Sequence, residues 1–499
     1  MRSTTSTSSD PAWGAKPDVP AGVLVFDLDG TLIANDLTHE LLFLCLRWHP
    51  LFLPLALFKL VMSRAAGKRW LVEKVGHHIL PEHLPYSPTA IALIESHLEV
   101  GGTVELVSGS DHVLVDRIGA HLGYFEHVQG SEPPRNLVAE QKAAHITERH
   151  GDAFRYAGNS NQDVPVWKVS SGGFGFNAPA RAFKLKRDDK TPIEIVKIQE
   201  GDGQLQSLIR AMRPHQWAKN LLIFMVPALV ISQLVPADWL KILAGFFCLS
   251  FLASGTYLIN DLFDVADDRA HATKKKRPIA AGVLSVPLAS FASIVLIVGS
   301  LACAFLVNLT FGLTALVYTF TTLAYSFRLK RMVIMDVMVL SFLFGLRVIA
   351  GAILASAPPS IWLLAFIGMF FLSLALAKRF VEVDRAKGKG AIRGRGYRDT
   401  DGPVLLGFGV ASAVAAVIAF MTYGLLAQER VLENGGVILC ISTVLMAWLM
   451  RLWLLTSRGE MNDDPVLFAV KDRTSLLTVM LLGGLTLFET SRPLWSSLF

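Results

Sequence analysis

The sequence predicts a chain of two parts, an N-terminal α/β domain with a Rossmann-like parallel sheet and a C-terminal all-α bundle of nine transmembrane helices. Residues 21–180 alternate short apolar segments with helical patterns, which is typical of a doubly wound sheet. Residues 210–499 contain a series of long apolar stretches. The composition agrees, because 52% of the 499 residues are hydrophobic and only 18% are charged. We therefore expect a membrane protein with a soluble N-terminal part.

Charge and cysteine content narrow the classes of partner. The formal net charge is +6 at pH 7, and the basic side chains cluster in loops between apolar stretches. Lipid head groups and phosphates are therefore the expected partners, and nucleic acid is not. The four cysteines stand in apolar stretches without a CxxC spacing, so neither a zinc site nor a disulfide framework is expected.

The N-terminal part begins with a predicted disordered leader, residues 1–20, which is rich in Ser, Thr and Pro and lacks the apolar segment of a signal peptide. In GVLVFDLDGTL, a predicted strand is followed by Asp27 and Asp29, which lie in a turn that Gly30 makes possible. Because parallel strands end at one edge of a sheet, we expect the site at this edge.

Three further segments of residues 21–180 bring polar side chains to the same edge. The strand TVELV ends at Ser108, a helix that starts near residue 142 carries Lys142, and the strand FRYA leads to Asn159 and Asp163. The segment GFGFN is predicted as the last strand.

These ordered motifs resemble the haloacid dehalogenase (HAD) superfamily of phosphatases. The resemblance implies that Asp27 attacks phosphorus and that Asp29 protonates the leaving oxygen and then activates water. It also implies that Ser108 and Lys142 hold the phosphoryl oxygens. The implied Mg²⁺ ligands are Asp27, Asp29, Asn159 and Asp163.

One position departs from the HAD pattern. Many members read GDSxxD where this chain reads GNSNQD, so Asn159 replaces a frequent metal carboxylate. An amide oxygen can still bind a metal, although more weakly. The competing interpretation is a HAD-like domain that binds phosphate or serves as a scaffold; the filled nucleophile, acid, Ser and Lys positions argue against it.

An insertion at about residues 35–100 is expected to form a helical cap. Its stretch LLFLCLRWHPLFLPLALFKLVM is very apolar, but Arg47, His49, Pro50 and Pro54 interrupt it. A membrane span needs roughly 20 apolar residues. We therefore expect two short helices that pack on the core or lie against the bilayer.

After a charged connector, residues 181–209, the transmembrane domain is expected over residues 210–499. The predicted spans are 219–236, 240–259, 286–307, 309–327, 333–354, 361–377, 403–426, 435–455 and 474–490. Loops on the N-terminal side hold most of the Lys and Arg, whereas the opposite loops hold Lys241, Arg430 and Arg492. The imbalance predicts a protein of the bacterial inner membrane with its N-terminal domain in the cytoplasm and its C-terminus outside.

The stretch INDLFDVADDRAHATKKKRPIAAG, residues 259–282, is the strongest chemical signal in the transmembrane part. In a helix, Asp261, Asp264 and Asp268 share one face. A hard cation such as Mg²⁺ would relieve their repulsion, and Lys274 and Arg277 suit phosphates. The competing interpretation is a solvated loop that obeys the positive-inside rule, which explains the lysines but not the spaced aspartates.

Other polar residues are expected on the same membrane face. They follow or precede predicted spans: Arg213, Lys219, Tyr325, Lys330, Asp336, Lys378 and Arg379. For each basic residue alone, a role in topology or in contact with lipid head groups is favoured over a role in substrate binding. Their convergence beside carboxylates favours a substrate site.

The predicted nine spans, NDxxDxxxD followed by KxxRP, and the later YSxxLK segment resemble the UbiA superfamily of membrane prenyltransferases over residues 205–499. The resemblance implies that Mg²⁺ on two Asp-rich motifs holds a diphosphate. The implied metal ligands are Asn260, Asp261, Asp264, Asp268 and Asp336. The second motif departs from the usual DxxxD, because Leu340 follows Asp336 four residues later.

The segments RPHQWAKN, DRAHATKKKRPIAAG, YSFRLK and LRVIAGA are similar to the decaprenyl-phosphate phosphoribosyltransferase branch of that superfamily. This similarity implies phosphoribosyl diphosphate as donor and a polyprenyl phosphate as acceptor. The implied substrate-binding residues are Asn260, Arg213, Lys219, Lys274, Arg277, Tyr325, Lys330, Lys378 and Arg379.

The resulting hypothesis is a bifunctional enzyme that makes polyprenyl-phosphoryl phosphoribose and then removes its 5-phosphate. One alternative is a prenyltransferase that uses a prenyl diphosphate donor and a lipophilic acceptor, with an unrelated phosphatase domain. Another is a lipid-phosphate binder or transporter with a regulatory HAD-like module. A homo-oligomer is compatible with the sequence, which does not decide the oligomeric state.

Overall fold

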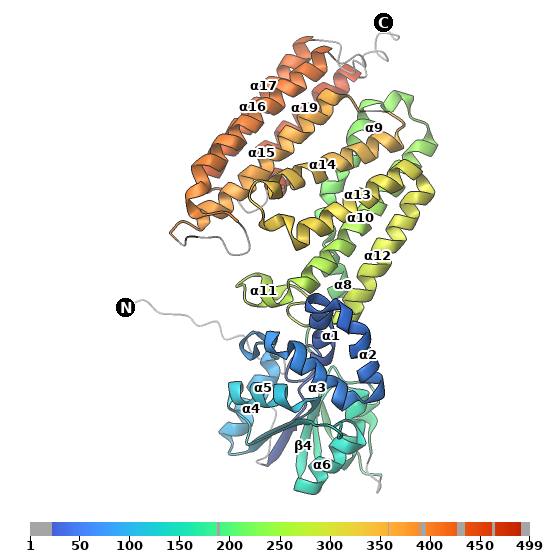
Figure 1. Cartoon of the computed structure of the whole chain (residues 1–499), viewed down its shortest axis with the longest axis vertical. Helices are drawn as coiled ribbons and strands as arrows, with labels where there is room; N and C mark the ends of the chain where they lie inside the picture. Colours follow the sequence, from blue (N-terminus) through green and yellow to red (C-terminus); the bar gives the residue numbers. More distant parts are fainter. Residues whose placement is uncertain are drawn as a thin grey trace. The chain divides into compact units, whose positions relative to one another are not determined.

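The computed structural model describes residues 22–186, 190–357, 359–388, 390, 396–426, 435–461 and 465–490. The predicted leader therefore lies outside the described residues. Two compact units are present (Figure 1). Unit one comprises Met1–Ala211 with Asp261–Ala292, and unit two comprises Met212–Asn260 with Ser293–Phe499.

Unit one contains a six-stranded parallel sheet, which confirms the predicted α/β class. In the strand order β3-β2-β1-β4-β5-β6, β1 is flanked by β2 and β4, and Phe26 of β1 pairs with Leu106 and Ala157. The strands are β1 (Val23–Phe26), β2 (Thr103–Asp111), β3 (His127–Ser131), β4 (Phe154–Gly158), β5 (Gly172–Phe176) and β6 (Ile195–Ile198). The sixth strand lies in the predicted connector, so GFGFN is not the last strand.

Both faces of the sheet are covered, as the sequence period of two requires. Leu24 and Phe26 belong to one buried cluster, and Val25 belongs to the cluster on the other face. The helices that connect the strands are α4 (Pro88–Glu99), α5 (His112–Leu122), α6 (Glu140–His150) and α7 (Val164–Val169). The central strand therefore ends in a dry environment, directly before Asp27.

The cap consists of α1 (Leu37–Trp48), α2 (Leu53–Met62) and α3 (Arg64–Val75). The two short helices expected in the apolar stretch are thus confirmed as α1 and α2. The side chain of Asp36 caps α1 by accepting hydrogen bonds from the Thr38 and His39 amides.

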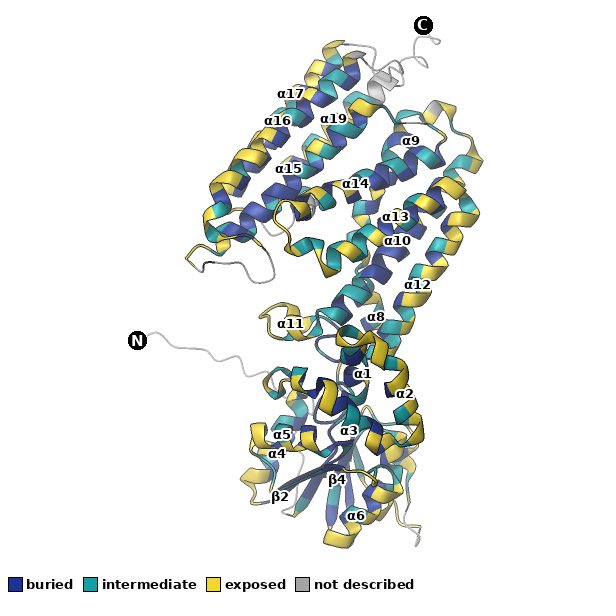
Figure 2. Ribbon diagram, in the orientation of Figure 1, coloured by how far each residue is buried: buried dark blue, intermediate teal, exposed yellow. Residues whose placement is uncertain are grey.

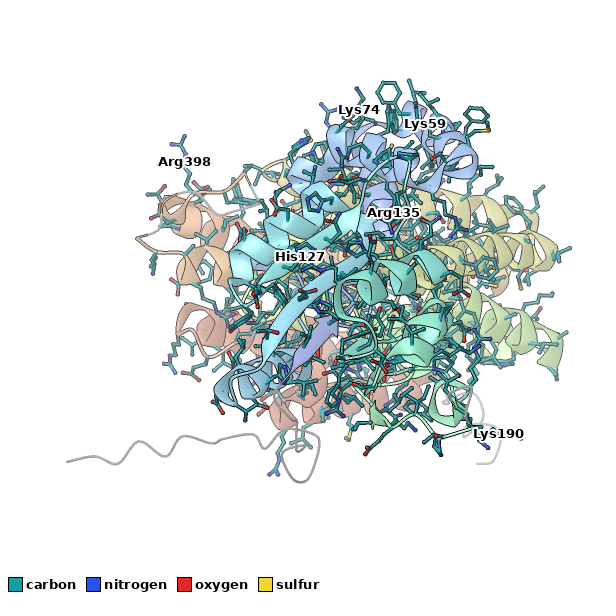
Figure 3. The ribbon with its side chains drawn as sticks, turned by 90° about the horizontal axis from the view of Figure 1, so that it is seen from below. Lys59, Lys74, His127, Arg135, Lys190 and Arg398 are labelled. Carbon is teal, nitrogen blue, oxygen red and sulfur yellow. The ribbon has the colours of Figure 1, made fainter. Side chains whose placement is uncertain are left out.

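Helix α2 exposes an apolar face, which is yellow in Figure 2. Leu51, just before it, is 90% exposed and Val61 is 85% exposed, whereas Ala56 is the buried residue of the helix. Lys59 and Lys74 project from α2 and α3 at one edge of unit one (Figure 3). Helix α2 therefore packs on the core through Ala56 and Leu60 and leaves its other, apolar side exposed.

Unit one also contains the Asp-rich segment. Helix α10 (Pro236–Phe263) continues past Asp261, a break at Asp264 follows, and α11 (Val265–Arg269) resumes the helix. A 3₁₀ helix, Lys274–Lys276, and the start of α12 (Val286–Val307) complete the segment.

The described residues of unit two are helical and include three buried apolar clusters, two of them large. Indole groups tie its helices together, since Trp453 donates to Ser373 and Trp448 donates to Ser475, each at 2.9 Å. Besides α10 and α12, its main helices are α13 (Leu309–Phe327), α14 (Met335–Leu354), α15 (Ile361–Arg385), α16 (Gly402–Leu426), α17 (Gly435–Ser457), α18 (Pro465–Lys471) and α19 (Arg473–Thr490).

The predicted count of nine spans is not confirmed. Among the described residues, six helices are long and apolar enough to cross a membrane: Pro236–Phe263, Val286–Val307, Met335–Leu354, Ile361–Arg385, Asp399–Leu425 and Gly435–Ser457. The chain is therefore an integral membrane protein.

The three other predicted spans differ from a long apolar helix for local reasons. The first is broken into a 3₁₀ helix, Pro214–Phe224, then α9 (Met225–Leu229) and a further 3₁₀ turn, Ile231–Gln233. Pro227, inside this predicted span, contributes because it removes a backbone donor. Helix α13 has 19 residues, several of them Thr or Tyr, and the apolar part of α19 is shorter than a span.

Candidate active sites

The first candidate site lies where β1 and β4 end side by side. The amide of Asp27 donates to Ala157 O on β4 at 2.9 Å, which continues the sheet pairing by one residue. Gly30 has a φ of +71°, and a Cβ there would lie 2.0 Å from Asn159 Nδ2. Only glycine therefore lets the loop after Asp27 and the loop after β4 approach this closely.

A buried cation joins two carboxylates in this site. Lys142 Nζ on α6 lies 2.8 Å from Asp27 Oδ1 and 3.5 Å from Asp163 Oδ1. Burial raises the pKa of Asp27 to about 6 although Lys142 opposes the shift. At Asp163 burial is outweighed, and the charge of Lys142 with hydrogen bonds from Tyr156 and Ser160 lowers the pKa.

Asp29 occupies a different environment. Ser110 Oγ donates to its Oδ2 at 2.6 Å, Ser108 Oγ lies 3.4 Å from the same oxygen, and the Leu37 amide donates to Oδ1 at 2.8 Å. Burial, together with the charges of Asp36 and Asp27, raises the pKa of Asp29 to about 7. Asp29 can therefore hold a proton near neutral pH while Asp163 remains ionised, which suits an acid beside a charged carboxylate.

These side chains line a cavity of about 350 Å³, within the range of roughly 300–1,000 Å³ that ligand pockets occupy. The structure brings the sequence-predicted Asp27, Asp29, Lys142, Asn159 and Asp163 into its lining. The carboxylates of Asp27 and Asp163 and the amide oxygen of Asn159 form a donor set that fits a hard divalent cation, with phosphate and water as its other ligands.

Sequence reasoning missed three residues of this site. Ser110 holds Asp29, the Tyr156 hydroxyl donates to Asp163 Oδ1 at 2.6 Å, and Lys68 of α3 lines the cavity. Ser110 and Tyr156 were within reach of the sequence, because each lies two residues from a predicted site position or strand end and hence on the same face of its strand. Lys68 lies in the cap, where the sequence carries no comparable signal.

The second candidate site is the Asp-rich cluster of unit one. Arg277 Nη1 lies 3.1 Å from Asp261 Oδ1 and 2.7 Å from Asp268 Oδ2. Burial raises the pKa of Asp268 to about 6 against the charge of Arg277. The structure thus brings two of the three predicted aspartates together around one guanidinium group.

The other predicted residues of the cluster are Asn260, Asp264 and Lys274. Asp264 lies at the break between α10 and α11, and its carbonyl accepts the Asp268 amide at 2.8 Å. Lys274 starts the 3₁₀ helix that leads to Arg277, and Asn260 precedes Asp261 in α10. Asp261 and Asp268 supply oxygen donors of the kind that Mg²⁺ prefers.

Within unit two, Asp336 is fully buried in an ion pair. Its Oδ2 lies 2.8 Å from Arg379 Nε, and neither side chain is exposed. The hydroxyl of Tyr397, which sequence reasoning missed, donates to Asp336 Oδ1 at 2.7 Å. Both oxygens of Asp336 therefore have protein partners, and its assignment as a metal ligand stays a prediction.

The other predicted residues of unit two lie at helix ends and turns. The guanidinium of Arg213 lies 5.1 Å from the ring centroid of Tyr257. Lys219 belongs to the 3₁₀ helix Pro214–Phe224, Tyr325 to α13, Lys330 to the 3₁₀ helix Leu329–Arg331 and Lys378 to α15. Their substrate-binding roles stay predictions.

No three His, Cys, Asp or Glu side chains of the described residues come together in a way that could hold a metal ion alone. A cation in either site of unit one would therefore take part of its ligands from substrate phosphate oxygens and water. This is the common mode of Mg²⁺ binding to phosphate-using enzymes.

Comparison with known proteins matches each part of the chain to a family. The UbiA prenyltransferase family matches residues 221–475, and the haloacid dehalogenase-like hydrolase family matches residues 24–168. The chain is 38% identical to the uncharacterised protein y4nM of Sinorhizobium fredii, over 91% of this chain and 88% of that protein.

Two further matches each cover more than half of this chain. The chain is 31% identical to the decaprenyl-phosphate phosphoribosyltransferase of Mycobacterium tuberculosis (strain H37Rv), over 58% of this chain and 95% of that enzyme. Among solved structures, a UbiA homologue from Archaeoglobus fulgidus bound to DMAPP and Mg²⁺ aligns with a TM-score of 0.46 and 22% identity, over 57% of this chain and 99% of that chain.

Proposed function

This chain belongs to the UbiA prenyltransferase family and carries a haloacid dehalogenase-like domain, and on that premise we propose that it is a bifunctional enzyme of lipid-linked pentose synthesis. The transferase part moves 5-phosphoribose from phosphoribosyl diphosphate to a polyprenyl phosphate. The phosphatase part then removes the 5-phosphate. The observation that carries the proposal is that unit one contains both a Lys142-centred carboxylate pair and an Arg277-centred carboxylate pair.

In the transferase step, an oxygen of the lipid phosphate attacks C1 of phosphoribosyl diphosphate, the bond from C1 to the diphosphate oxygen breaks, and the diphosphate leaves. Asp261, Asp264 and Asp268 would hold Mg²⁺, with Asn260 beside them. The ion, when bound, neutralises the charge that develops on the leaving diphosphate. Arg277 lies between Asp261 and Asp268 and can form charge-assisted hydrogen bonds with the same group.

The basic residues Arg213, Lys219, Lys274, Lys330, Lys378 and Arg379 are proposed to bind the sugar 5-phosphate and the lipid phosphate, with Tyr325 near them. The relatives named decaprenyl-phosphate phosphoribosyltransferase support this donor and acceptor, at 31% identity over 58% of the chain. Asp336 is the remaining proposed metal ligand.

In the phosphatase step, Asp27 attacks the phosphorus of the 5-phosphomonoester, and the bond from phosphorus to the ribose oxygen breaks. Asp29 gives its proton to that oxygen and then takes one from the water that hydrolyses the aspartyl phosphate. Ser108 and Lys142 orient the phosphoryl oxygens. Asp27, Asn159 and Asp163 would hold Mg²⁺, which shields the charge between nucleophile and phosphate.

Having both activities on one chain raises the effective concentration of the phosphorylated intermediate at the second site. The uneven distribution of Lys and Arg supports an orientation in which both sites face the cytoplasm of a bacterial inner membrane and the C-terminus lies outside. The product would be a lipid-linked pentose donor for envelope glycans.

The donor is tested with membranes that contain the protein and a labelled substrate. We expect label from phosphoribosyl diphosphate to enter lipid when polyprenyl phosphate is present. Label entering lipid only from a prenyl diphosphate would establish the prenyltransferase alternative instead. Failure of both donors, with retained binding of lipid phosphate, would support a binder or transporter.

A further inference from the structure

The cavity of the phosphatase site has a wall that comes from the transferase part of the sequence. On one side the cavity is lined by Asp27, Asp29 and Lys142, and on another by Gln204, Gly282, Ser285 and Val286. Residues 280–286, called here the wall segment, fall within the stretch that matches the UbiA family. They also fall within unit one, together with the phosphatase-like sheet.

The wall segment is held by two polar side chains. Arg269 of α11 donates from Nε to Ala280 O at 2.9 Å. Gln204 of α8 (Gln204–Met212) donates from Nε2 to Val283 O at 2.8 Å and accepts the Ser285 amide at 3.1 Å. The backbone of the wall is therefore hydrogen-bonded near both of its ends.

The wall also packs against the loop that follows the nucleophile. Gly282 has a φ of +75°, and a Cβ there would lie 2.8 Å from Ala34 Cβ and 3.2 Å from the Asn35 amide nitrogen. Asn35 in turn accepts the Gly30 amide at 3.1 Å through its carbonyl oxygen. The wall thus touches the loop that carries Asp29.

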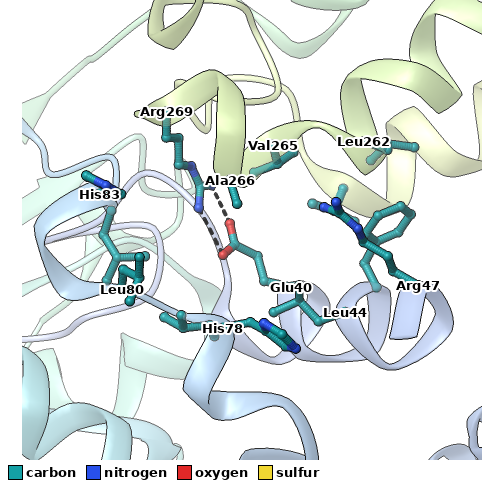
Figure 4. Close-up of a pocket in the computed structure, with 14 residues that line it drawn as sticks. Glu40, Leu44, Arg47, His78, Leu80, His83, Leu262, Val265, Ala266 and Arg269 are labelled. Atoms are coloured by element: carbon teal, nitrogen blue, oxygen red, sulfur yellow. Dashed lines mark hydrogen bonds and ion pairs between the residues drawn. The ribbon is translucent and has the colours of Figure 1, made fainter. Parts of the chain in front are cut away.

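A buried ion pair connects these parts. Arg269 contacts the carboxylate of Glu40 in α1 through both terminal nitrogens, one at 3.1 Å, and both side chains are less than 10% exposed (Figure 4). Glu40 also accepts a hydrogen bond from the side-chain amide of Asn35. Arg269 therefore binds the wall with one nitrogen and the cap helix with the other two.

We propose that the wall segment, with Ser285 at its exposed end, is the specificity-determining element of the phosphatase pocket, and that Arg269 and Glu40 are positioning residues that hold it. A phosphomonoester whose phosphorus lies at Asp27 must place its alcohol part in the rest of the same cavity, where the wall lies. The proposal rests on the proposed phosphatase function. It adds that the wall segment determines whether a sugar phosphate can bind in the cavity.

The test uses the full-length protein and the variant Ser285→Trp, which adds a large side chain at an exposed position of the wall. Ribose 5-phosphate serves as the soluble substrate and inorganic phosphate as a competitive inhibitor that needs only the phosphoryl subsite. We expect the KM for ribose 5-phosphate to rise about tenfold or more, since an occupied pocket discriminates on this scale, while the inhibition constant of phosphate stays nearly unchanged. Thr147→Trp, exposed on α6 away from the cavity, is the matched control and leaves both constants unchanged.

A second pair of variants tests the positioning residues. Arg269→Met should raise the KM for ribose 5-phosphate more than it lowers kcat. Arg269→Lys should recover part of the loss, because lysine keeps the positive charge but lacks the planar guanidinium group that donates several hydrogen bonds. Equal changes for ribose 5-phosphate and inorganic phosphate, or no change in Ser285→Trp, would overturn the proposal, as would a wild-type protein that hydrolyses no ribose 5-phosphate.

The outcome is separable from that of the proposed function. Suppose that the wall variants alter selectivity but the wild-type enzyme leaves the lipid-linked phosphoribose intact. The proposed role of the wall segment is then supported, and the proposed lipid substrate is contradicted. If the lipid is trimmed and the wall variants behave as wild type, the proposed function stands and the wall has no role in selectivity.

Discussion

The two candidate sites of unit one share one arrangement, a cation between two carboxylates, but differ in burial. Lys142 lies between Asp27 and Asp163 with its side chain 3% exposed, whereas Arg277 lies between Asp261 and Asp268 with its side chain 28% exposed. A buried cation between carboxylates cannot leave without exposing them to uncompensated repulsion. Arg277 is partly exposed, so water solvates part of its guanidinium group, although both of its carboxylate partners are buried.

The comparison suggests different roles for the two cations. Lys142 is enclosed in its site, so we expect the carboxylates of the first candidate site to be in place before a substrate binds. Arg277 is partly exposed and can form hydrogen bonds with an incoming diphosphate, and its two carboxylate partners would hold Mg²⁺.

The largest expected effect is the loss of the nucleophile. Asp27→Asn should lower phosphatase turnover by roughly 1,000-fold or more, because the amide cannot form the aspartyl phosphate. The transferase step should continue, so the lipid product should keep its 5-phosphate. Mass spectrometry of extracted lipid measures this, with the exposed Asp152→Asn as control. A product with the wild-type phosphorylation state would show that the two activities are not coupled.

The second effect contrasts the two cations directly. Lys142→Met should lower the free energy of unfolding of unit one by roughly 3–5 kcal/mol, because two buried carboxylates lose their partner. Arg277→Met should cost less, because water can solvate this partly exposed position and Asp268, whose pKa burial raises to about 6, can take up a proton when its partner is lost. Pulse proteolysis of the protein in detergent measures both, and Lys168→Met, exposed on α7, serves as control. Similar losses for Lys142 and Arg277 would end the distinction between an enclosed and a partly exposed cation.

The third effect concerns the transferase. Asp268→Asn should lower transferase activity about 100-fold and raise the Mg²⁺ concentration needed for half-maximal rate, since one charged oxygen ligand is lost. Asp267→Asn changes the neighbouring exposed residue and should have little effect. Equal activity of the two variants would remove Asp268 from the site.

Much of the first site could be predicted from the sequence, because its residues follow buried strands directly. Asp27 follows β1 and Asn159 follows β4, so the parallel sheet alone brings them together. Helical spacing predicted Asp261 and Asp268 on one face of a continuous helix, but the helix breaks at Asp264, and the two carboxylates come together around Arg277 instead.

The rest depends on contacts that join distant parts of the chain. The ion pair of Arg269 with Glu40 joins residues 229 positions apart, and no local pattern indicates it. The sixth strand was missed because IEIVKI stands in a charged neighbourhood that resembles a connector. The nine-span count was not confirmed among the described residues, in part because hydropathy alone could not reveal the break of the first predicted span into 3₁₀ turns.

The smallest predicted effect is a pH dependence that belongs to the phosphatase alone. Burial raises the pKa of Asp29 to about 7, so the protonated acid is present below that pH and is lost as pH rises through it. Above pH 7 the kcat/KM for ribose 5-phosphate should fall about tenfold per pH unit, because the alkoxide leaving group needs the proton. With p-nitrophenyl phosphate, whose leaving group departs without protonation, this fall should be absent. A fall of equal slope for both esters would assign the titration to another group, and the same fall in the transferase rate would remove the separation between the two sites.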